Sequence, residues 1–143
     1  MLIYKWFSGE DHIEDCKALR REVFVREQGV SPTEEEDGCD AQAMHLALYL
    51  NGELAATARL FPQTWLVGRV AVAKGERGTG LGRKLMEEVF RYALVHGAAC
   101  MHVHAQRQAV PFYEALGFVS EGEPFSEAGI KHLPMRKDLK KPV

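Results

Sequence analysis

Residues 69–85 read Arg69-Val70-Ala71-Val72-Ala73-Lys74-Gly75-Glu76-Arg77-Gly78-Thr79-Gly80-Leu81-Gly82-Arg83-Lys84-Leu85. This segment contains an apolar run typical of a strand, a basic loop, and the first turn of a helix. Glycine occupies every second position of the loop, and because glycine has no Cβ, an anion can approach the backbone N–H groups closely. The following helix adds unpaired N–H groups and the positive end of its dipole. The segment therefore predicts a phosphate-binding turn, with extra positive charge from Arg77, Arg83 and Lys84.

Two common phosphate-binding motifs do not match this loop. A P-loop has Lys and then Ser or Thr after its second glycine, whereas Arg83, Lys84 and Leu85 follow Gly82 here. A dinucleotide-binding motif has the pattern G-x-G-x-x-G at the start of an early βαβ unit, whereas this loop reads G-x-G-x-G midway along the chain. A glycine-rich turn that binds no ligand stays open as the simpler alternative.

The composition indicates a single domain over residues 1–143. Hydrophobic residues make up 46% and charged residues 27% of the chain, which is ordinary for a soluble globular protein. A net charge of -2 argues against a nucleic-acid partner, and the apolar runs are shorter than the roughly 18 residues of a membrane span. The three cysteines lack C-x-x-C spacing, and we see no secretory leader, so we expect a cytoplasmic protein.

Hydrophobic periodicity predicts elements in the order β-α-β-β-β-α-β-α-β-β, which is an α+β, or mixed α/β, layer fold. The Asn51-Gly52 pair predicts a tight hairpin. The strand after the long helix should lie parallel to the strand that ends at Val72, because the helix makes a right-handed crossover. The predicted strands are 2–6, 44–50, 53–61, 65–72, 99–104, 118–120 and 130–137. The predicted helices are 80–96, 109–116 and an earlier one that follows capping groups at residues 8–11 and ends at Gly29.

Four stretches resemble the GNAT superfamily of acetyl-CoA-dependent N-acyltransferases. Residues 77–82 resemble its R/Q-x-x-G-x-G/A signature, and Pro111-Phe112-Tyr113-Glu114-Ala115-Leu116-Gly117-Phe118 resembles its F-Y-E-x-L-G-F segment. Residues 21–30 and 127–135 are similar to the YjcF-like and ElaA-like branch of that superfamily. The resemblance covers nearly the whole chain. That branch is defined by sequence more than by a settled acceptor.

The resemblance implies the fold and the binding site for acetyl-CoA. It implies a central, mostly antiparallel sheet with helices on both faces and one parallel strand pair that splays apart at the cofactor. In such proteins the glycine loop grips the pyrophosphate, and the pantetheine arm lies in the gap between the two strands. Carried over, the cofactor-binding residues would be Val70, Ala71, Val72, Arg77, Gly78, Thr79, Gly80, Leu81, Gly82, Arg83, Gln106, Phe112 and Tyr113.

The resemblance also implies direct acetyl transfer to a primary amine of a small molecule or peptide. Tyr113 is the candidate general acid, because a phenol at this place lies near the sulfur in the family. Alternatively, Tyr113 packs beside Phe112 and Phe118 as an ordinary core aromatic. The candidate base is Glu36, from an acidic run in which Glu35 and Asp37 are equally suited. This run, residues 30–40, is otherwise predicted to be a solvated loop.

Four of the six histidines lie in predicted strands, and none of these four has an assigned role. His102 and His104 share one face of a predicted strand, a spacing that suits a metal, but no third ligand is near in sequence. We therefore expect no metal, and packed or cofactor-lining side chains instead. His45 and His132 lie within predicted strands and stay open between structural and functional roles. Two other functions stay open as well, a non-catalytic acyl-CoA sensor and a nucleotide-binding protein, and the sequence leaves open whether two copies pair.

Overall fold

The computed structural model describes residues 1–139, in which eight strands form one sheet. The strand order is β1-β2-β3-β4-β5-β8-β6, and β7 also pairs with β8. The strands are β1 Leu2–Ser8, β2 Met44–Leu50, β3 Glu53–Phe61, β4 Leu66–Val72, β5 Cys100–Gln106, β6 Val119–Ser120, β7 Phe125–Glu127 and β8 Ile130–Asp138. The longer helices are α1 Glu14–Arg20, the π-helix η1 Arg21–Glu27, α2 Pro32–Glu35, α3 Leu81–Val95 and α4 Val110–Ala115. Short 3₁₀ turns cover Asp40–Gln42, Lys74–Glu76 and Arg107–Ala109.

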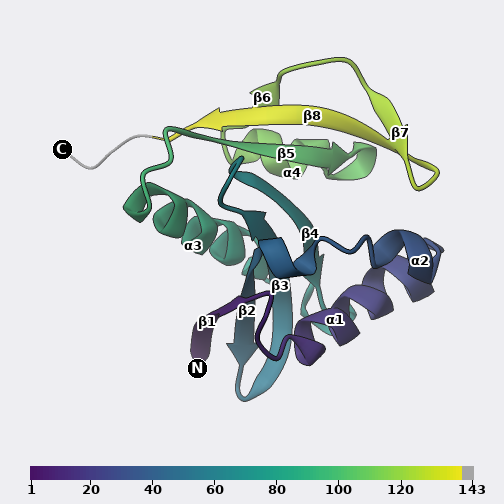
Figure 1. The fold of residues 1–143 in the computed structure, drawn as a ribbon, viewed down its shortest axis with the longest axis vertical. Coiled ribbons are helices and arrows are strands. Elements are labelled where there is room, and N and C mark those ends of the chain that lie inside the picture. The colour runs from purple at the N-terminus through teal and green to yellow at the C-terminus, as the bar shows by residue number, and fades with distance from the viewer. Residues whose placement is uncertain (140–143) are drawn as a thin grey trace.

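The sheet is antiparallel except between β4 and β5. Those two parallel strands pair only at Leu66 with His102 and at Val67 with Val103. Beyond these residues the strands diverge, so β1 to β4 form one half of the sheet and β5 to β8 the other (Figure 1). The predicted mixed fold with one splayed parallel pair is confirmed.

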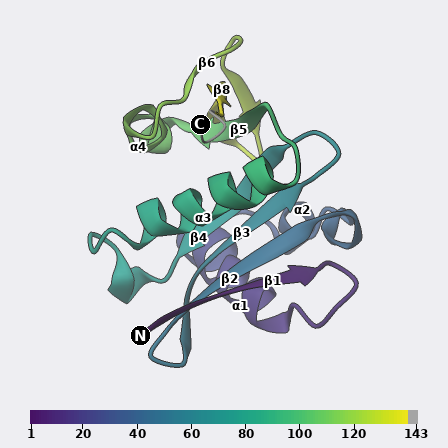
Figure 2. The same cartoon turned by 90° about the vertical axis from the view of Figure 1, so that its left-hand side faces the viewer.

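Helices cover both faces of the first half-sheet, with α3 on one side and α1 and α2 on the other (Figure 2). The main core forms under α3 because its apolar residues recur at helical spacing. A smaller cluster of Ile13, Cys16 and Ala47 lies under α1. The residues that α3 buries are Leu81, Leu85, Met86, Val89 and Ala93.

Most predicted elements are confirmed within a few residues. Asn51 and Gly52 adopt positive φ angles of 51° and 87°, as a two-residue hairpin turn of this type requires. The first predicted helix is instead two elements, since α1 passes into the π-helix η1 at Arg21. Strand β7 was not predicted, because it has only three residues and its turn to β8 contains Ala128, which takes a positive φ of 53° without being a usual turn residue.

The acidic run does not form a simple solvated loop. It contains α2 and ends where the 3₁₀ turn Asp40–Gln42 begins, and Glu35 is only 1% exposed. The carboxylates of Glu35, Asp37 and Asp40 bind arginines that come from three other elements. Sequence patterns missed this because the arginines lie 15 to 34 positions from their partners.

Candidate active site

The gap between β4 and β5 exposes backbone polar groups. The N–H of Ala73 donates to the carbonyl of Ala55 on β3, so the neighbouring residue Val72 directs its backbone groups away from β3. Consistent with this, the Val72 carbonyl accepts a hydrogen bond from Arg77 Nε at 3.0 Å. The Val72 N–H therefore faces the gap, where a ligand can accept a hydrogen bond from it.

A β-bulge shapes β4 beside this gap. Thr57 pairs with Ala71 and Arg59 pairs with Gly68, so β4 has one more residue than β3 between these pairs. Within the bulge, Arg69 has a φ of 49°, a conformation that costs a non-glycine residue about 1 kcal/mol. The bulge begins where the pairing of β4 with β5 ends.

The first cavity, which we call the loop cavity, measures about 370 Å³ and is bordered by the glycine loop, the start of α3 and one side of α4. Gly78 and Gly80 have φ angles of 79° and 84°, and a Cβ added to either would meet no atom within 4 Å. The backbone of these two glycines is therefore accessible, because no atom lies close to the side where a side chain would be. The predicted site residues that border this cavity are Val72, Arg77, Gly78, Gly80, Leu81, Gly82, Arg83 and Phe112.

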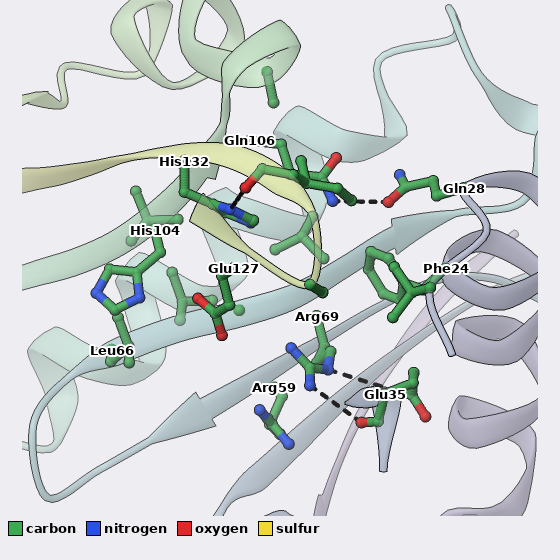
Figure 3. A pocket seen from close by; sticks show the side chains of 18 of the residues that line it. Phe24, Gln28, Glu35, Arg59, Leu66, Arg69, His104, Gln106, Glu127 and His132 are labelled. Carbon is green, nitrogen blue, oxygen red and sulfur yellow. Dashed lines mark hydrogen bonds and ion pairs between the residues drawn. The ribbon is translucent and has the colours of Figure 1, made fainter. Parts of the chain in front are cut away.

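The second cavity, which we call the central cavity, measures about 330 Å³ and lies between the two halves of the sheet. Of the predicted site residues, Val70, Gln106 and Tyr113 border it. Glu127, His104 and His132 also border it, from the second half-sheet, and Arg59 and Arg69 border it from the first (Figure 3). The loop cavity and the central cavity thus share two walls, β4 and α4.

Tyr113 is largely buried between two aromatic rings. It is 6% exposed, and its ring meets Phe112 and Phe118 nearly edge-on at centroid distances of 5.1 and 5.5 Å. Burial raises the pKa of the Tyr113 phenol well above its ordinary value, so the hydroxyl stays protonated. The two sequence-based interpretations are therefore compatible, because the ring packs in the core and the residue also borders the central cavity.

Three arginines and three carboxylates form a closed ring under the central cavity, which we call the arginine ring. Arg20 donates to Glu35 and Asp40, Arg59 to Asp40 and Asp37, and Arg69 to Asp37. The ring closes between Arg69 Nε and Glu35 Oε1, which lie 3.6 Å apart. Arg69 also donates to the backbone carbonyls of Glu34 and Glu35. The acidic run is thereby fixed to the β4 bulge.

The π-helix η1 also reaches the site, which the sequence did not indicate. Arg77 donates from Nη2 to Glu27 Oε1 at 2.6 Å. Gln106 donates to Oε1 of Gln28, the residue that follows η1, at 2.8 Å (Figure 3). Phe24 and Gln28 border the central cavity. A wide π-helical turn often lies at a functional site, but no sequence pattern distinguishes it from an α-helix.

Several predicted residues lie away from both cavities. Glu36 borders neither; its carboxylate lies 4.0 Å from Lys17 Nζ and 3.8 Å from Arg21 Nη1. Thr79 donates through Oγ1 to the carbonyl of Glu76, and Ala71 is 2% exposed within the core. The structure therefore brings Glu35, and not Glu36, to the central cavity.

The histidines take different places. His104 and His132 border the central cavity, whereas His102 binds Glu121 outside it. His45 is buried, its Nε2 lies 3.1 Å from the carbonyl oxygen of Asp40, and burial lowers its pKa. Within residues 1–139 no group of three potential ligands has metal-binding geometry, and no helix is long and apolar enough to cross a membrane.

Comparison with known proteins identifies the family and its fold. A family model described as an acetyltransferase (GNAT) domain matches residues 10–139. The chain belongs to the GNAT acetyltransferase family. It is therefore an acyltransferase, and the GNAT signature at the loop cavity and the GNAT segment on α4 flank the gap between β4 and β5.

Individual GNAT proteins match over almost the full length. The Bacillus subtilis protein named N-acetyltransferase YjcF is 37% identical over 136 residues, covering 92% of this chain and 96% of that protein. The crystal structure of an acyl-CoA N-acyltransferase from Pseudomonas aeruginosa superposes with a TM-score of 0.85 at 32% identity, covering 96% and 99% of the two chains. Escherichia coli ElaA superposes with a TM-score of 0.84 at 27% identity, covering 96% and 100%. The expected similarity to YjcF and ElaA is confirmed.

Proposed function

We propose that this GNAT domain transfers an acetyl group from acetyl-CoA to a primary amine of a small molecule or peptide. The observation that carries the proposal is that β4 and α4 each border both the loop cavity and the central cavity. Val72 and Phe112 border the loop cavity, whereas Val70 and Tyr113, on the same strand and helix, border the central cavity. An elongated ligand with a phosphate at one end and a reactive group at the other fits this arrangement.

The residues of the loop cavity suit a pyrophosphate. The bare backbone at Gly78 and Gly80 and the N-terminus of α3 favour an anion, and Arg83 adds a full charge beside them. Arg77 donates hydrogen bonds to Glu27 and to the Val72 carbonyl, so its guanidinium lies beside the end of β4. In this proposal the backbone N–H groups of Val70 and Val72 bind the arm and the acyl oxygen.

When bound, acetyl-CoA supplies an activated acyl group and a thiolate leaving group. Tyr113 holds a proton for that thiolate, since its raised pKa keeps the phenol protonated. Because Glu36 lies away from the cavity, we assign the carboxylate that receives the amine to Glu127, which borders the central cavity beside His104 and Arg69 (Figure 3). A carboxylate there attracts a cationic amine and accepts its proton directly or through water.

The Tyr113→Phe variant tests the proposal. We expect acetyl-CoA affinity, measured by calorimetry, to stay within about twofold, and turnover, measured by thiol release with an amine panel, to fall at least about tenfold, which corresponds to about 1.4 kcal/mol of barrier. Tyr92→Phe is the matched control, because Tyr92 stacks on Trp6 and His96 and borders neither cavity. Unchanged turnover in Tyr113→Phe would remove Tyr113 from the mechanism.

The same measurements separate the other two functions. Acetyl-CoA binding without transfer to any amine would favour a non-catalytic sensor. Tighter binding of ATP than of acetyl-CoA would favour a nucleotide-binding protein. Either result would contradict the proposed acetyl transfer.

A further inference from the structure

A second cluster of reactive side chains lies on β5 outside both cavities. Cys100 Sγ is 3.6 Å from His102 Nε2, and His102 Nδ1 is 2.6 Å from Glu121 Oε2. The His102 and Glu121 side chains are 31% and 30% exposed, and Cys100 is half-buried. None of the three borders the loop cavity or the central cavity. Solvent molecules can therefore reach this cluster independently of the acetyl-transfer site.

The backbone holds these three residues in register. Cys100 and His102 are two positions apart on one strand, so their side chains point to the same face. The His102 N–H donates to the Trp65 carbonyl at 3.0 Å, and the Glu121 N–H donates to the Pro134 carbonyl at 2.9 Å. The contact between thiol, imidazole and carboxylate thus joins two segments, β5 and the residue after β6, that are separately fixed to the sheet.

The order of these groups gives His102 a defined role. An ionised carboxylate only accepts hydrogen bonds, so Glu121 orients the Nδ1–H of His102 toward itself. In the neutral imidazole, Nε2 then carries the lone pair, and Nε2 is the atom that faces the Cys100 thiol. A thiol next to a base that a third group orients is the arrangement of an activated nucleophile.

Two residues of opposite charge on β8, Arg136 and Asp138, lie across from the cluster. Arg136 pairs across the strands with His102 and Asp138 pairs with Cys100, and Arg136 donates to Asp138 at 2.9 Å. The hydrogen bond and the charge of Asp138 raise the pKa of Arg136, with smaller contributions from Cys100 and Glu121. Because Asp138 neutralises Arg136, this pair adds no net charge beside Cys100, and the activation of the thiol depends on His102.

We propose that Cys100 is a nucleophilic thiol that exchanges with disulfides of low-molecular-weight thiols, with His102 as its base and Glu121 as the residue that orients His102. His102 Nε2 takes the thiol proton, and Cys100 Sγ attacks one sulfur of the disulfide RS–SR. The S–S bond of the reagent breaks, and a mixed disulfide, Cys100–S–S–R, forms. The departing thiolate takes the proton from His102 and leaves as RSH. The disulfide is the oxidant, so the step needs no other reagent.

The other two cysteines serve as internal controls. Cys39 is also half-buried, but its described contact is a hydrogen bond from Sγ to the backbone carbonyl of Asp37 at 3.6 Å. Cys16 is 1% exposed, and burial raises its pKa, so it should react slowly. The comparison of Cys100 with Cys39 therefore isolates the effect of the histidine at similar burial.

The experiment measures the rate at which each thiol is modified. The reduced full-length protein is mixed at neutral pH with glutathione disulfide or with 5,5′-dithiobis(2-nitrobenzoate), and the modified cysteine is identified by peptide mass spectrometry. In folded protein we expect Cys100 to react at least about tenfold faster than Cys39, and in denaturant the two rates should converge. We expect His102→Asn to slow Cys100 about tenfold and Glu121→Gln to slow it by a smaller factor, because the base remains but is less well oriented.

Two outcomes would overturn the proposal. One is that Cys100 reacts no faster than Cys39 in folded protein. The other is that His102→Asn folds, as judged by circular dichroism, and leaves the Cys100 rate unchanged. The Cys100→Ser variant should keep the rate of acetyl transfer, so a failure of this proposal is distinguishable from a failure of the proposed acetyltransferase activity.

Discussion

Arg20 donates from Nε to Glu35 Oε1 across 2.6 Å, and each of these side chains is only 1% exposed. The pair joins α1 to the acidic run and belongs to the arginine ring beneath the central cavity. Buried charges are costly unless each one is matched, so the ring fixes where the acidic run lies relative to β3 and β4. The ring thereby links the stability of the fold to the shape of the candidate active site.

Removing one partner of this pair should be strongly destabilising. We expect Arg20→Met to lower the free energy of unfolding by about 3–5 kcal/mol, because Glu35 would keep a buried charge without its nearest partner. Arg26→Met is the matched control, since Arg26 and Glu22 form an ion pair whose side chains are 76% and 53% exposed. That control should change stability by less than about 0.5 kcal/mol in urea titrations. Equal effects of the two substitutions would show that the arginine ring has no special importance.

The conformation of Arg69 gives a second prediction. Arg69→Gly and Arg69→Ala both lose the hydrogen bonds to Glu34, Glu35 and Asp37, but only the glycine variant relieves the backbone strain at a φ of 49°. We expect the glycine variant to be more stable than the alanine variant by about 1 kcal/mol. Thermal and urea unfolding of the two proteins measures this difference.

The same pair of variants tests whether Arg69 positions the bulge. We expect kcat/KM to fall at least about tenfold in both, because the backbone N–H groups of β4 lose their anchor to the acidic run. Normal activity in Arg69→Ala would mean that the bulge keeps its shape without the guanidinium group.

The lowered pKa of Asp37 predicts how the free energy of unfolding depends on pH. Burial, the largest single effect, raises its pKa, but the hydrogen bonds from Arg59 and the Cys39 N–H and the charges of Arg59 and Arg69 outweigh it and lower the pKa to about 2. Since the folded pKa lies below the unfolded value of 3.8, this stabilisation is present above about pH 4 and is lost as the pH falls toward about 2. Asp37→Asn should flatten the stability curve in that window.

The expected size of this effect is modest. Asp37 is partly exposed to solvent, so after screening we expect its contribution to be about 1 kcal/mol. Urea unfolding at several values between about pH 2 and pH 6 provides the measurement. Part of the acid sensitivity should persist in Asp37→Asn, because the arginines also lower the pKa of Asp40. A wild-type curve that is flat over this range would contradict the prediction.

A substitution at Gly80 tests acetyl-CoA binding, provided that the new residue tolerates the backbone conformation of Gly80. Its φ of 84° would strain valine, so Asn, which tolerates this conformation, is the better substitution. We expect Gly80→Asn to weaken acetyl-CoA binding at least about tenfold, because the new side chain enters the open space beside the bare amides. Calorimetric titration measures the affinity.

Gly52→Asn is the matched control for this variant. Gly52 has a φ of 87° in the hairpin between β2 and β3, and a Cβ there also meets nothing within 4 Å. The two variants should therefore lose similar, small amounts of stability, while Gly52→Asn should keep full affinity. An equal affinity in both variants would mean that acetyl-CoA does not bind at the glycine loop.

Local sequence patterns were sufficient for the order of most elements. The Asn51-Gly52 turn, the apolar runs of β2 and β3 and the apolar stripe of α3 each depend on residues close together in the chain. The glycine loop belongs to the same class, because the conformations of Gly78 and Gly80 follow from their own lack of a side chain. For this reason both the fold class and the open glycine turn before α3 were predictable.

Contacts between distant residues were decided only by the tertiary structure. Nothing in the sequence distinguishes Glu35, which is buried against Arg20, from Glu36, which faces solvent near Lys17 and Arg21, because the two are adjacent and chemically alike. Likewise, Cys100, His102 and Glu121 meet only when β6 and β8 pair and bring Glu121 beside β5. Local propensity is encoded residue by residue, whereas the partner of a charge is set by which strands lie side by side.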